Sequence, residues 1–513
     1  MEVTRQMGVQ YLWIDDLCIQ DCEEGSYSDQ IKDMHRVYGN AQFAIIAAQG
    51  TATEGLAGVR PRETSARVIN GVEVNDTLAF VNSRPLPKSI AKSPWVTRGW
   101  CLQEQLLSKR FLVFWDNQVY WQCSKTMEFE DMPLSMKPDY VKTLSKRARQ
   151  SENTIDTTTP VMKHSRLPFG VRGLGIDLGS AHMDGSSSWT HSTMEQGKLG
   201  TIVVRTPLFR EYTSIVNLYT SRTLTRDDDA LNAVDGLLSL ISIGLATPML
   251  YGLPECLLDT ALLWYADQPL RRRCRGTIPS WSWAGWKEGR IAYQASTEFE
   301  PRSRKLVPST TDHQEDVKPF VVWWKAGEES ESGSAAVLVN ETGAGVKTDS
   351  RTRPHDWRYM EKVLDYIEPQ AGRTPSQVPH PLGPMYLQFG TMCCLDIVDD
   401  LGDNGDLIEQ RTQYCAGRIY TDSQKPISSL KSSARPRKER LALVVLSEAQ
   451  YFSSGQLNER LSLYEYEFKY LLYNVLLVLL NRTTGVASRL GIGKVYKRHW
   501  NSHIPEWRMI RLR

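Results

Sequence analysis

The sequence has no long apolar segment and little cysteine. Its most apolar run, residues 470–480, is about 11 residues long, whereas a membrane-spanning helix needs roughly 20, so we expect a buried strand or core helix there and no membrane association. The start, MEVTRQMGVQ, lacks the apolar segment of a signal peptide. The 9 cysteines among 513 residues are odd in number and irregularly spaced, which excludes a disulfide scaffold. Reduced thiols and a cytoplasmic location are expected.

The chain also lacks an excess of charge of either sign. Its 61 basic and 59 acidic residues leave a formal net charge of +2, which excludes a broadly basic nucleic-acid binder. Two short basic runs, residues 271–275 and 431–440, are more typical of solvated loops than of a nucleic-acid footprint. With 41% hydrophobic residues, the chain is expected to form globular domains with no nucleic-acid partner.

Common catalytic and metal-binding motifs are missing too. The chain has no H-E-x-x-H, and His499 and His503 lie four residues apart with no further ligand pattern beside them. It has no C-x-x-C pair and no G-x-S-x-G elbow. Gly173, Gly175 and Gly179 are spaced one residue wider than a dinucleotide fingerprint, without a clear preceding strand. We therefore expect no metal and no bound cofactor.

The first 130 residues alternate strand and helix patterns. Apolar runs at residues 11–14 and 43–48 predict buried strands, and helical spacing between them predicts a helix over 31–38. This order is typical of a parallel α/β layer. A second helix is expected over 99–108, followed by a hairpin of residues 111–115 and 118–123, whose second arm alternates polar and apolar residues.

Four passages, taken together and in order, carry a family resemblance. They are YLWIDDLCIQD at 11–21, WVTRGWCLQEQLLSKRFLVF at 95–114, RTLTRDDDALNAVDGLL at 222–238 with IPSWSWAGW at 278–286, and YNVLLVLL to YKRHW at 473–500. The chain resembles fungal heterokaryon incompatibility (HET) domain proteins. The first two passages are similar to the HET domain itself, and the last two to the region that often follows it.

The resemblance implies an organisation in five segments. A partial HET domain is expected at 1–135, a flexible linker at 136–200, a helical region ending in WSWAGW at 201–290, a variable and partly disordered insertion at 291–380, and a mostly β region at 381–513. The fold class is thus an α/β, TIR-like domain with a parallel sheet, followed by a mixed α+β region. Family members usually have a strand and helix before the LWID segment, so we expect the first strand to be missing.

In function, the resemblance implies nonself recognition between fungal individuals. HET domains act as effectors that induce growth arrest and programmed cell death in fused cells, so the expected partners are proteins, including other copies of the chain. Two alternatives stay open: a TIR-like NAD glycohydrolase, with NAD as substrate only, and an inactive truncated paralogue. Whether the chain is an enzyme is left open by the sequence.

Candidate site residues cluster in the first two passages. Asp15 and Asp16 follow the expected strand that contains Trp13, and ligands of open α/β sheets bind where strands end. The paired carboxylates are candidates for acid/base work, with Trp13 as a binding residue. The plain alternative is that one of them caps a following turn or helix while the other is solvated.

The second passage contains R-x-W-x-x-Q-E, with Arg98, Trp100, Gln103 and Glu104. Trp100 and Glu104 are four apart, so both can face one cleft from a helix. Glu104 is the best single catalytic candidate, because a carboxylate beside an aromatic ring can stabilise an oxocarbenium-like state; the other three are binding candidates. The favoured alternative is structural, with an Arg98–Glu104 ion pair and a tryptophan packed on the sheet.

The tryptophans of WSWAGW have two interpretations. On a strand, Trp281 and Trp283 would point to the same side and could form a stacking surface for a nucleotide or sugar. A packed aromatic seam that also contains Trp286 is favoured. Among the three functions, the effector predicts that cell death survives Glu104→Ala, whereas the enzyme predicts that both death and NAD loss disappear.

Overall fold

The computed structural model of the chain describes part of its length. The residues it describes are 1–19, 30–31, 33–50, 55–56, 59, 71–74, 77–80, 90, 93–115, 118–123, 127–129, 202–203, 207–245, 247–266, 268–273, 277–293, 297–300, 305–308, 316–321, 323–326, 336–338, 386–410, 413–422, 425–433, 438–449 and 472–513. The expected linker at 136–200, with the glycines at 173, 175 and 179, lies outside these residues, as does most of the expected insertion at 291–380.

The contacts divide the chain into two compact units. The N-terminal unit comprises Met1–Gly185, Arg222–Leu224 and Asn232–Leu237. The C-terminal unit comprises Ser186–Ser221, Thr225–Leu231 and Leu238–Arg513. Two short pieces of the third passage thus belong with the N-terminal unit, although they follow it far along the chain.

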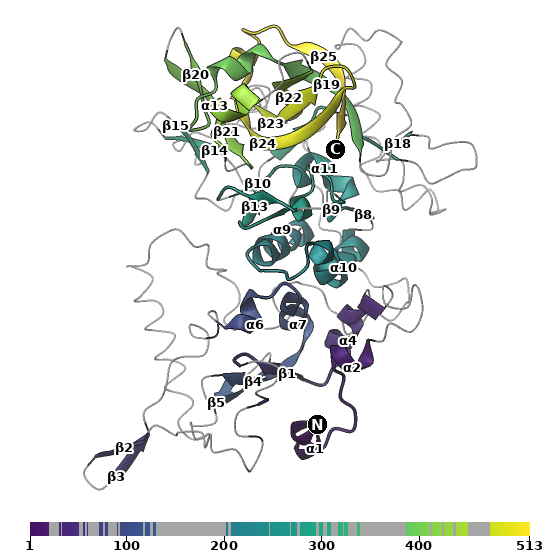
Figure 1. The fold of residues 1–513 in the computed structure, drawn as a ribbon, viewed down its shortest axis with the longest axis vertical. Helices are drawn as coiled ribbons and strands as arrows, with labels where there is room; N and C mark the ends of the chain where they lie inside the picture. The colour runs from purple at the N-terminus through teal and green to yellow at the C-terminus, as the bar shows by residue number, and fades with distance from the viewer. Residues whose placement is uncertain are drawn as a thin grey trace, which may run out of the picture. The chain divides into compact units, whose positions relative to one another are not determined.

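A mixed sheet forms the centre of the N-terminal unit (Figure 1). Its order is β1-β4-β5-β6, made of β1 (Ala44–Ala47), β4 (Arg110–Trp115), β5 (Gln118–Cys123) and β6 (Met127–Phe129). β1 pairs with β4 in parallel, and the other pairs are antiparallel. The expected strand at 43–48 and the expected hairpin are confirmed. A wholly parallel sheet is wrong, because two residues between β4 and β5 are too few for the crossover that parallel strands need.

Short helices accompany this sheet: α1 (Glu2–Gln6), α2 (Asp15–Cys18), α4 (Met34–Asn40), α6 (Pro94–Thr97) and α7 (Cys101–Leu107), with a separate hairpin of β2 (Gly71–Val74) and β3 (Thr77–Phe80). α4 and α7 confirm the two helices expected from the spacing. Trp95, Cys101, Phe111, Val113 and Tyr120 are buried together in one core cluster. The helices α6 and α7 therefore pack onto the sheet through the same apolar core.

The expected strand at residues 11–14 is wrong. These residues belong to no described strand, and Tyr11 is 81% exposed. Ile14 instead forms the N-cap of α2, with Asp15 and Asp16 in the first turn. Acidic side chains favour a helix N-terminus because they face its positive dipole end, so the apolar run followed by two aspartates leads into a helix. The placement of Asp15 and Asp16 at the end of a strand is wrong with it.

The C-terminal unit begins with helices and small sheets. Its elements up to residue 338 include α9 (Pro207–Thr220), η3 (Asp227–Ala230), α10 (Asp235–Leu245) from Leu238 on, η5 (Glu255–Leu257), α11 (Leu258–Ala261) and η6 (Trp283–Gly285), while η4 (Asn232–Val234) belongs to the N-terminal unit. The strands in this part are β7 (Ile202–Val203), β8 (Met249–Leu250), β9 (Leu253–Pro254), β10 (Trp264–Ala266), β11 (Arg271–Arg272), β12 (Trp286–Lys287), β13 (Ile291–Tyr293), β14 (Thr297–Glu300), β15 (Lys305–Pro308), β16 (Asp316–Pro319), β17 (Trp324–Ala326) and β18 (Ala336–Leu338).

The end of the chain is mostly β, as its alternating apolar runs predict. Its strands are β19 (Leu387–Cys394), β20 (Asp406–Glu409), β21 (Tyr414–Thr421), β22 (Glu439–Ala449), β23 (Leu472–Asn481), β24 (Val486–Tyr496) and β25 (Glu506–Leu512), with η8 (Asp396–Asp400), α13 (Ile427–Ser433) and α14 (Lys497–Trp500) between them. The pairings run β19-β25-β24-β23-β22, and β22 also pairs with β19. These five strands thus form a closed ring of pairings, drawn in green and yellow in Figure 1.

The tryptophans of WSWAGW lie in the interior of this unit. Trp281, Trp283 and Trp286 are at most 6% exposed, and the indole N–H of Trp286 donates to the Ser280 carbonyl at 2.8 Å. The expected stacking surface is wrong and the aromatic seam is confirmed. Trp283 starts a 3-10 turn instead of continuing a strand, because Ser282 caps that turn by accepting from the Ala284 N–H.

The first basic run also has internal partners. Arg272 donates to the carbonyl oxygens of Ile278 and Gly285 at 2.8 and 2.9 Å, and Arg273 pairs with Asp227 at 2.9 Å. Only Arg271 is exposed, beside an exposed Glu288. The solvated loop expected here is wrong for two of the three arginines, since the guanidinium groups satisfy buried backbone carbonyls.

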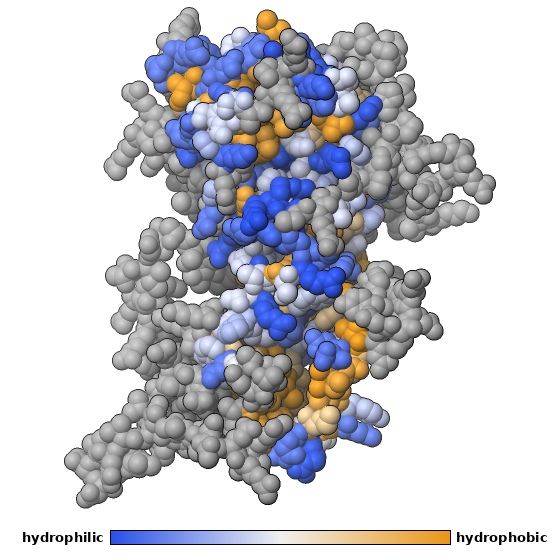
Figure 2. All heavy atoms as spheres, in the orientation of Figure 1, coloured by the Kyte–Doolittle hydropathy of each residue, from blue (hydrophilic) through white to orange (hydrophobic). Residues whose placement is uncertain are grey.

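Among the residues that the structure describes, few large apolar side chains are exposed. Figure 2 shows apolar residues gathered on part of the drawn face of the N-terminal unit. Met7 and Leu17 of this unit are 46% and 58% exposed. Among the described helices, none has the length and apolar character needed to cross a membrane.

Candidate functional site

The Glu104 carboxylate is held between two helices of the N-terminal unit. It lies on α7, and the indole N–H of Trp95 on α6 donates to its Oε2 atom at 2.8 Å. Ser93 begins α6 as its N-cap and accepts from the Val96 N–H at 3.3 Å. Since Trp95 is only 6% exposed, the hydrogen bond links the carboxylate to the apolar core.

Two further polar side chains lie near the same carboxylate. They are Tyr38 on α4 and Cys101 at the start of α7, and the charge of Glu104 raises the pKa of both groups. Residues of three helices, α4, α6 and α7, thus meet around Glu104. We name this group of Tyr38, Trp95, Cys101 and Glu104 the Glu104 cluster.

Burial raises the pKa of Glu104 above its ordinary value. The hydrogen bonds from Trp95 and Cys101 and the positive charge of Arg98 lower this pKa, while the negative charge of Asp15 raises it. The net direction is upward, because taking a carboxylate out of water disfavours its charged form. A carboxyl group with a raised pKa is suited to proton transfer nearer to neutral pH.

The other two titratable members stay neutral. Burial raises the pKa of Tyr38, and the charges of Glu104 and Asp15 raise it further. Burial and then the Glu104 charge also raise the pKa of the Cys101 thiol. A thiol becomes a nucleophile only as a thiolate, so Cys101 supports the carboxylate and is not itself a nucleophile.

A segment of the third passage pairs through backbone hydrogen bonds with the stretch of chain that joins α6 to α7. The N–H of Gly99 donates to the Thr223 carbonyl at 2.8 Å, and the N–H of Thr223 donates to the Thr97 carbonyl at 2.7 Å. A Cβ on Gly99 would lie 2.5 Å from the Leu224 side chain. The glycine of the R-G-W sequence therefore permits this close approach.

Arg222 anchors that segment. It donates to the Arg98 carbonyl at 3.1 Å and to the side-chain oxygen of Gln105. Burial lowers the pKa of Arg222 to about 10, although the charges of Cys101 and Glu104 act in the opposite direction. The guanidinium stays protonated at neutral pH and adds positive charge near the Glu104 cluster.

The structure brings four predicted residues into one neighbourhood. Arg98 and Asp15 act on Glu104 through their charges, and the Trp13 ring packs edge-on against Tyr38 with centroids 5.7 Å apart. The expected Arg98–Glu104 ion pair is absent from the contacts of the described residues, so the structural alternative is wrong in that detail. Its packed tryptophan is present, but it is Trp95.

Three predicted residues lie elsewhere. Asp16 is exposed, and its backbone N–H donates to the Asp15 carboxylate at 3.0 Å. Trp100 is the N-cap of α7. Gln103 is fully buried and donates to the Ala233 carbonyl at 3.0 Å, a structural contact. The expectation that Trp100 shares a cleft with Glu104 has no supporting contact, since Trp95 holds the carboxylate.

Sequence reasoning missed four members of the site: Tyr38, Trp95, Cys101 and Arg222. Trp95 and Cys101 lie in the same passage as Glu104, but a spacing of four on the helix expected over 99–108 selects Trp100. Trp95 precedes that helix and lies on a separate one, α6, because Arg98 adopts extended backbone between α6 and α7. A spacing rule within one helix therefore does not identify Trp95.

The comparisons with known proteins give one match. Residues 1–104 match the family model described as heterokaryon incompatibility protein (HET). The chain carries a HET domain. None of the curated proteins and none of the solved structures compared with the chain matches it. The matched residues of the HET domain include the entire Glu104 cluster together with Trp13, Asp15 and Arg98.

The HET domain matched over residues 1–104 implies a role related to heterokaryon incompatibility. The site itself offers a half-buried carboxylate with a raised pKa, one indole donor, two neutral polar side chains and nearby positive charge. This arrangement can hold three helices in a fixed geometry, and it can also exchange a proton. The two properties lead to the two functions considered next.

Proposed function

We propose that the chain is an effector of heterokaryon incompatibility that induces growth arrest and programmed cell death in fused fungal cells. Its partners in this role are proteins, including further copies of itself, and it acts in the cytoplasm without nucleic acid or membrane. The exposed apolar side chains of Met7 and Leu17 support a protein partner, because such groups gain from burial in an interface.

One observation carries the proposal: the segment that matches the HET family contains the whole Glu104 cluster. The Trp95 indole N–H on α6 donates to the Glu104 carboxylate on α7, and the polar side chains of Tyr38 and Cys101 lie near it. The carboxylate thus helps to hold the arrangement of α4, α6 and α7. This favours a conformational role in signalling, in which Glu104 maintains the surface that partners bind.

The Glu104 carboxylate beside the Trp95 indole supports a second candidate, a TIR-like NAD glycohydrolase with NAD as its substrate. Cleavage of a glycosidic bond develops positive charge on the sugar, which a carboxylate beside aromatic rings can stabilise. Arg98 and the hydrogen bonds from Trp95 and Cys101 favour the ionised form that this role requires. In this alternative, Glu104 touches the substrate and its charge is essential.

The experiment separates charge from hydrogen bonding at Glu104. The full chain is expressed from an inducible promoter in a filamentous fungus, and colony viability and cellular NAD are measured. Glu104→Gln keeps an oxygen acceptor for the Trp95 N–H but removes the charge. The effector predicts that wild type and Glu104→Gln both cause loss of viability, with NAD unchanged before growth stops.

The enzyme predicts a different outcome for the same variant. Loss of an essential charge lowers a rate by orders of magnitude, since about 1.4 kcal/mol already corresponds to tenfold, so NAD and viability would both be preserved. Glu104→Ala is a weaker test, because it leaves the buried Trp95 N–H without its acceptor at a cost of about 1–3 kcal/mol. Asp33→Asn is the matched control, since this carboxylate of the same unit is exposed and pairs only with exposed Arg36. Normal growth with soluble wild-type protein present would contradict the effector.

A further inference from the structure

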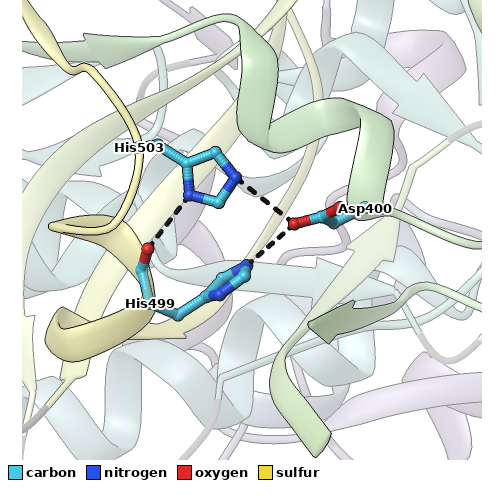
Figure 3. A group of neighbouring side chains, drawn as sticks. All are labelled: Asp400, His499 and His503. Carbon is cyan, nitrogen blue, oxygen red and sulfur yellow. Dashed lines mark hydrogen bonds and ion pairs between the residues drawn. The ribbon is translucent and has the colours of Figure 1, made fainter. Parts of the chain in front are cut away.

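Three potential metal ligands converge in the C-terminal unit from two distant parts of the sequence. Asp400 ends η8, His499 lies on α14, and His503 lies in the turn that follows. The Nε2 atoms of both histidines lie 3.3 Å from the same Asp400 oxygen, Oδ2 (Figure 3). One ligand atom from each residue lies within 4.8 Å of the other two.

The tautomer of His503 is fixed by its second nitrogen. Nδ1 lies 3.0 Å from the His499 carbonyl oxygen, which can only accept, so Nδ1 carries the proton. In the neutral ring, Nε2 then presents its lone pair to the Asp400 carboxylate. A lone pair facing a carboxylate oxygen needs a positive centre between them, either a proton or a metal ion. A backbone carbonyl that orients the far nitrogen in this way is typical of metal-bound histidines.

His499 shows the same need more strongly. Its side chain is 5% exposed, and both ring nitrogens are buried without a hydrogen-bond partner among the residues that the structure describes. The Nε2 atom of this buried ring faces the Asp400 carboxylate at 3.3 Å, where a metal ion could bind both groups.

Two of the three donor-to-donor distances match a small divalent ion. Ligand atoms at about 2.0–2.1 Å from a tetrahedral Zn²⁺ lie about 3.3 Å from one another, which equals both Asp400–histidine distances, and the two histidine ligand atoms lie within 4.8 Å of each other. We propose that Asp400, His499 and His503 form a binding site for one divalent transition-metal ion, such as Zn²⁺. Two neutral imidazoles and one carboxylate are a donor set that suits Zn²⁺ and its neighbours.

The site has two consequences for the molecule. Three protein ligands leave a tetrahedral ion one position for water or another small ligand, as in catalytic zinc sites. The ion would also link η8, which follows β19, to α14, which lies between β24 and β25. The sequence showed two of the ligands, four residues apart, but the third comes from a different element.

Cobalt binding to the purified full chain provides the test. Co²⁺ is titrated into metal-free protein, and the visible absorption of the ion is recorded together with the thermal unfolding temperature. We expect one equivalent to bind with a tetrahedral spectrum that lacks sulfur-to-cobalt charge-transfer bands, which distinguishes this site from the free cysteines. Zn²⁺ should displace the Co²⁺, and either ion should raise the unfolding temperature.

Variants assign the binding to this site. Asp400→Asn and His503→Gln should each weaken binding by more than about 100-fold, since even outer-shell partners contribute 10–100-fold. Asp399→Asn, an exposed neighbour on the same turn, and His35→Gln of the other unit are the controls and should bind as wild type. Absence of a nitrogen- and oxygen-ligated spectrum in the wild type would overturn the proposal. Wild-type affinity in folded Asp400→Asn or His503→Gln would also overturn it, and leave a protonated histidine paired with Asp400.

Discussion

The two units stabilise their buried carboxylates in different ways. In the N-terminal unit, the half-buried Glu104 is surrounded by neutral donors, and burial raises its pKa. In the C-terminal unit, Asp422 is fully buried against an equally buried Arg489, with Nε and Oδ2 2.8 Å apart. Burial raises the pKa of Asp422 and lowers that of Arg489, and each charge opposes the shift of the other.

The two carboxylates differ in how many parts of the chain they hold together. Arg489 also donates to the Leu262 and Trp264 carbonyls and stacks 3.3 Å from the centre of the Trp264 ring. This network joins strand β24 to segments of the helical part of the same unit, so it is a structural centre. The Glu104 cluster instead holds short helices together around one half-buried carboxylate, to which the Trp95 N–H donates.

The largest effect is expected when the buried ion pair is broken. Arg489→Ala leaves Asp422 charged and uncompensated, and we expect a loss of about 3–5 kcal/mol in the free energy of unfolding. Arg271→Ala removes the same residue type from an exposed pair with Glu288 and should change stability by no more than about 0.5 kcal/mol. Urea unfolding of the full chain, followed by tryptophan fluorescence, measures both. Equal losses in the two variants would show that the buried pair is not a structural centre.

A smaller difference in stability is expected between alanine substitutions at two glycines. A Cβ on Gly493 in β24 would collide with the Arg418 carbonyl oxygen of the paired strand β21, whereas on Gly99 it would lie 2.5 Å from the flexible Leu224 side chain. Because backbone cannot move aside as a side chain can, we expect losses of about 3 kcal/mol for Gly493→Ala and about 1 kcal/mol for Gly99→Ala. The same unfolding experiment checks the order, and a larger loss for Gly99→Ala would reverse the comparison.

A pH dependence of stability is expected at Asp259 of the C-terminal unit. Burial raises the pKa of this carboxyl to about 7, although the Trp323 indole N–H donates to it at 3.0 Å. The folded state therefore binds more protons than the unfolded state between pH 3.8 and about 7, and the stability contributed by the protonated form is lost as the pH rises through this window.

Asp259→Asn tests this dependence while keeping an acceptor for Trp323. The free energy of unfolding of the wild type should fall relative to this variant as the pH is raised from 4 to 8. Glu288→Gln, at an exposed carboxylate, is the control. Parallel pH profiles for wild type and Asp259→Asn would show that Asp259 titrates alike in both states.

Sequence patterns predicted much of the fold where the period was clear. The apolar run at 43–48 is strand β1, the alternating arm at 118–123 is β5, and the final alternating runs form the ring of β22 to β25. The prediction at residues 11–14 was wrong, because four apolar residues are compatible with either a strand or a helix entry. These four residues alone do not specify whether a neighbouring strand exists with which they could pair.

The candidate site was predicted only in part for the same physical reason. Glu104, Arg98 and Asp15 were identified from their own passages. Trp95 was missed because the break between α6 and α7 changes which tryptophan faces Glu104, and Arg222 was missed because it comes from a passage more than a hundred residues away. Asp400, the third ligand of the proposed metal site, was missed for the same reason, since it is distant in sequence from the two histidines. Pairings between distant segments depend on tertiary packing, which a local pattern does not contain.

Colony viability after induced expression of the unmodified chain, compared with Glu104→Gln at equal soluble levels, tests the account most directly. The account predicts growth arrest and death with both proteins, because the HET domain acts through a surface that the Glu104 cluster supports and the glutamine keeps the acceptor for Trp95. Survival of cells that contain soluble wild-type protein would contradict it, and so would death that occurs only with the charged glutamate and follows a fall in NAD.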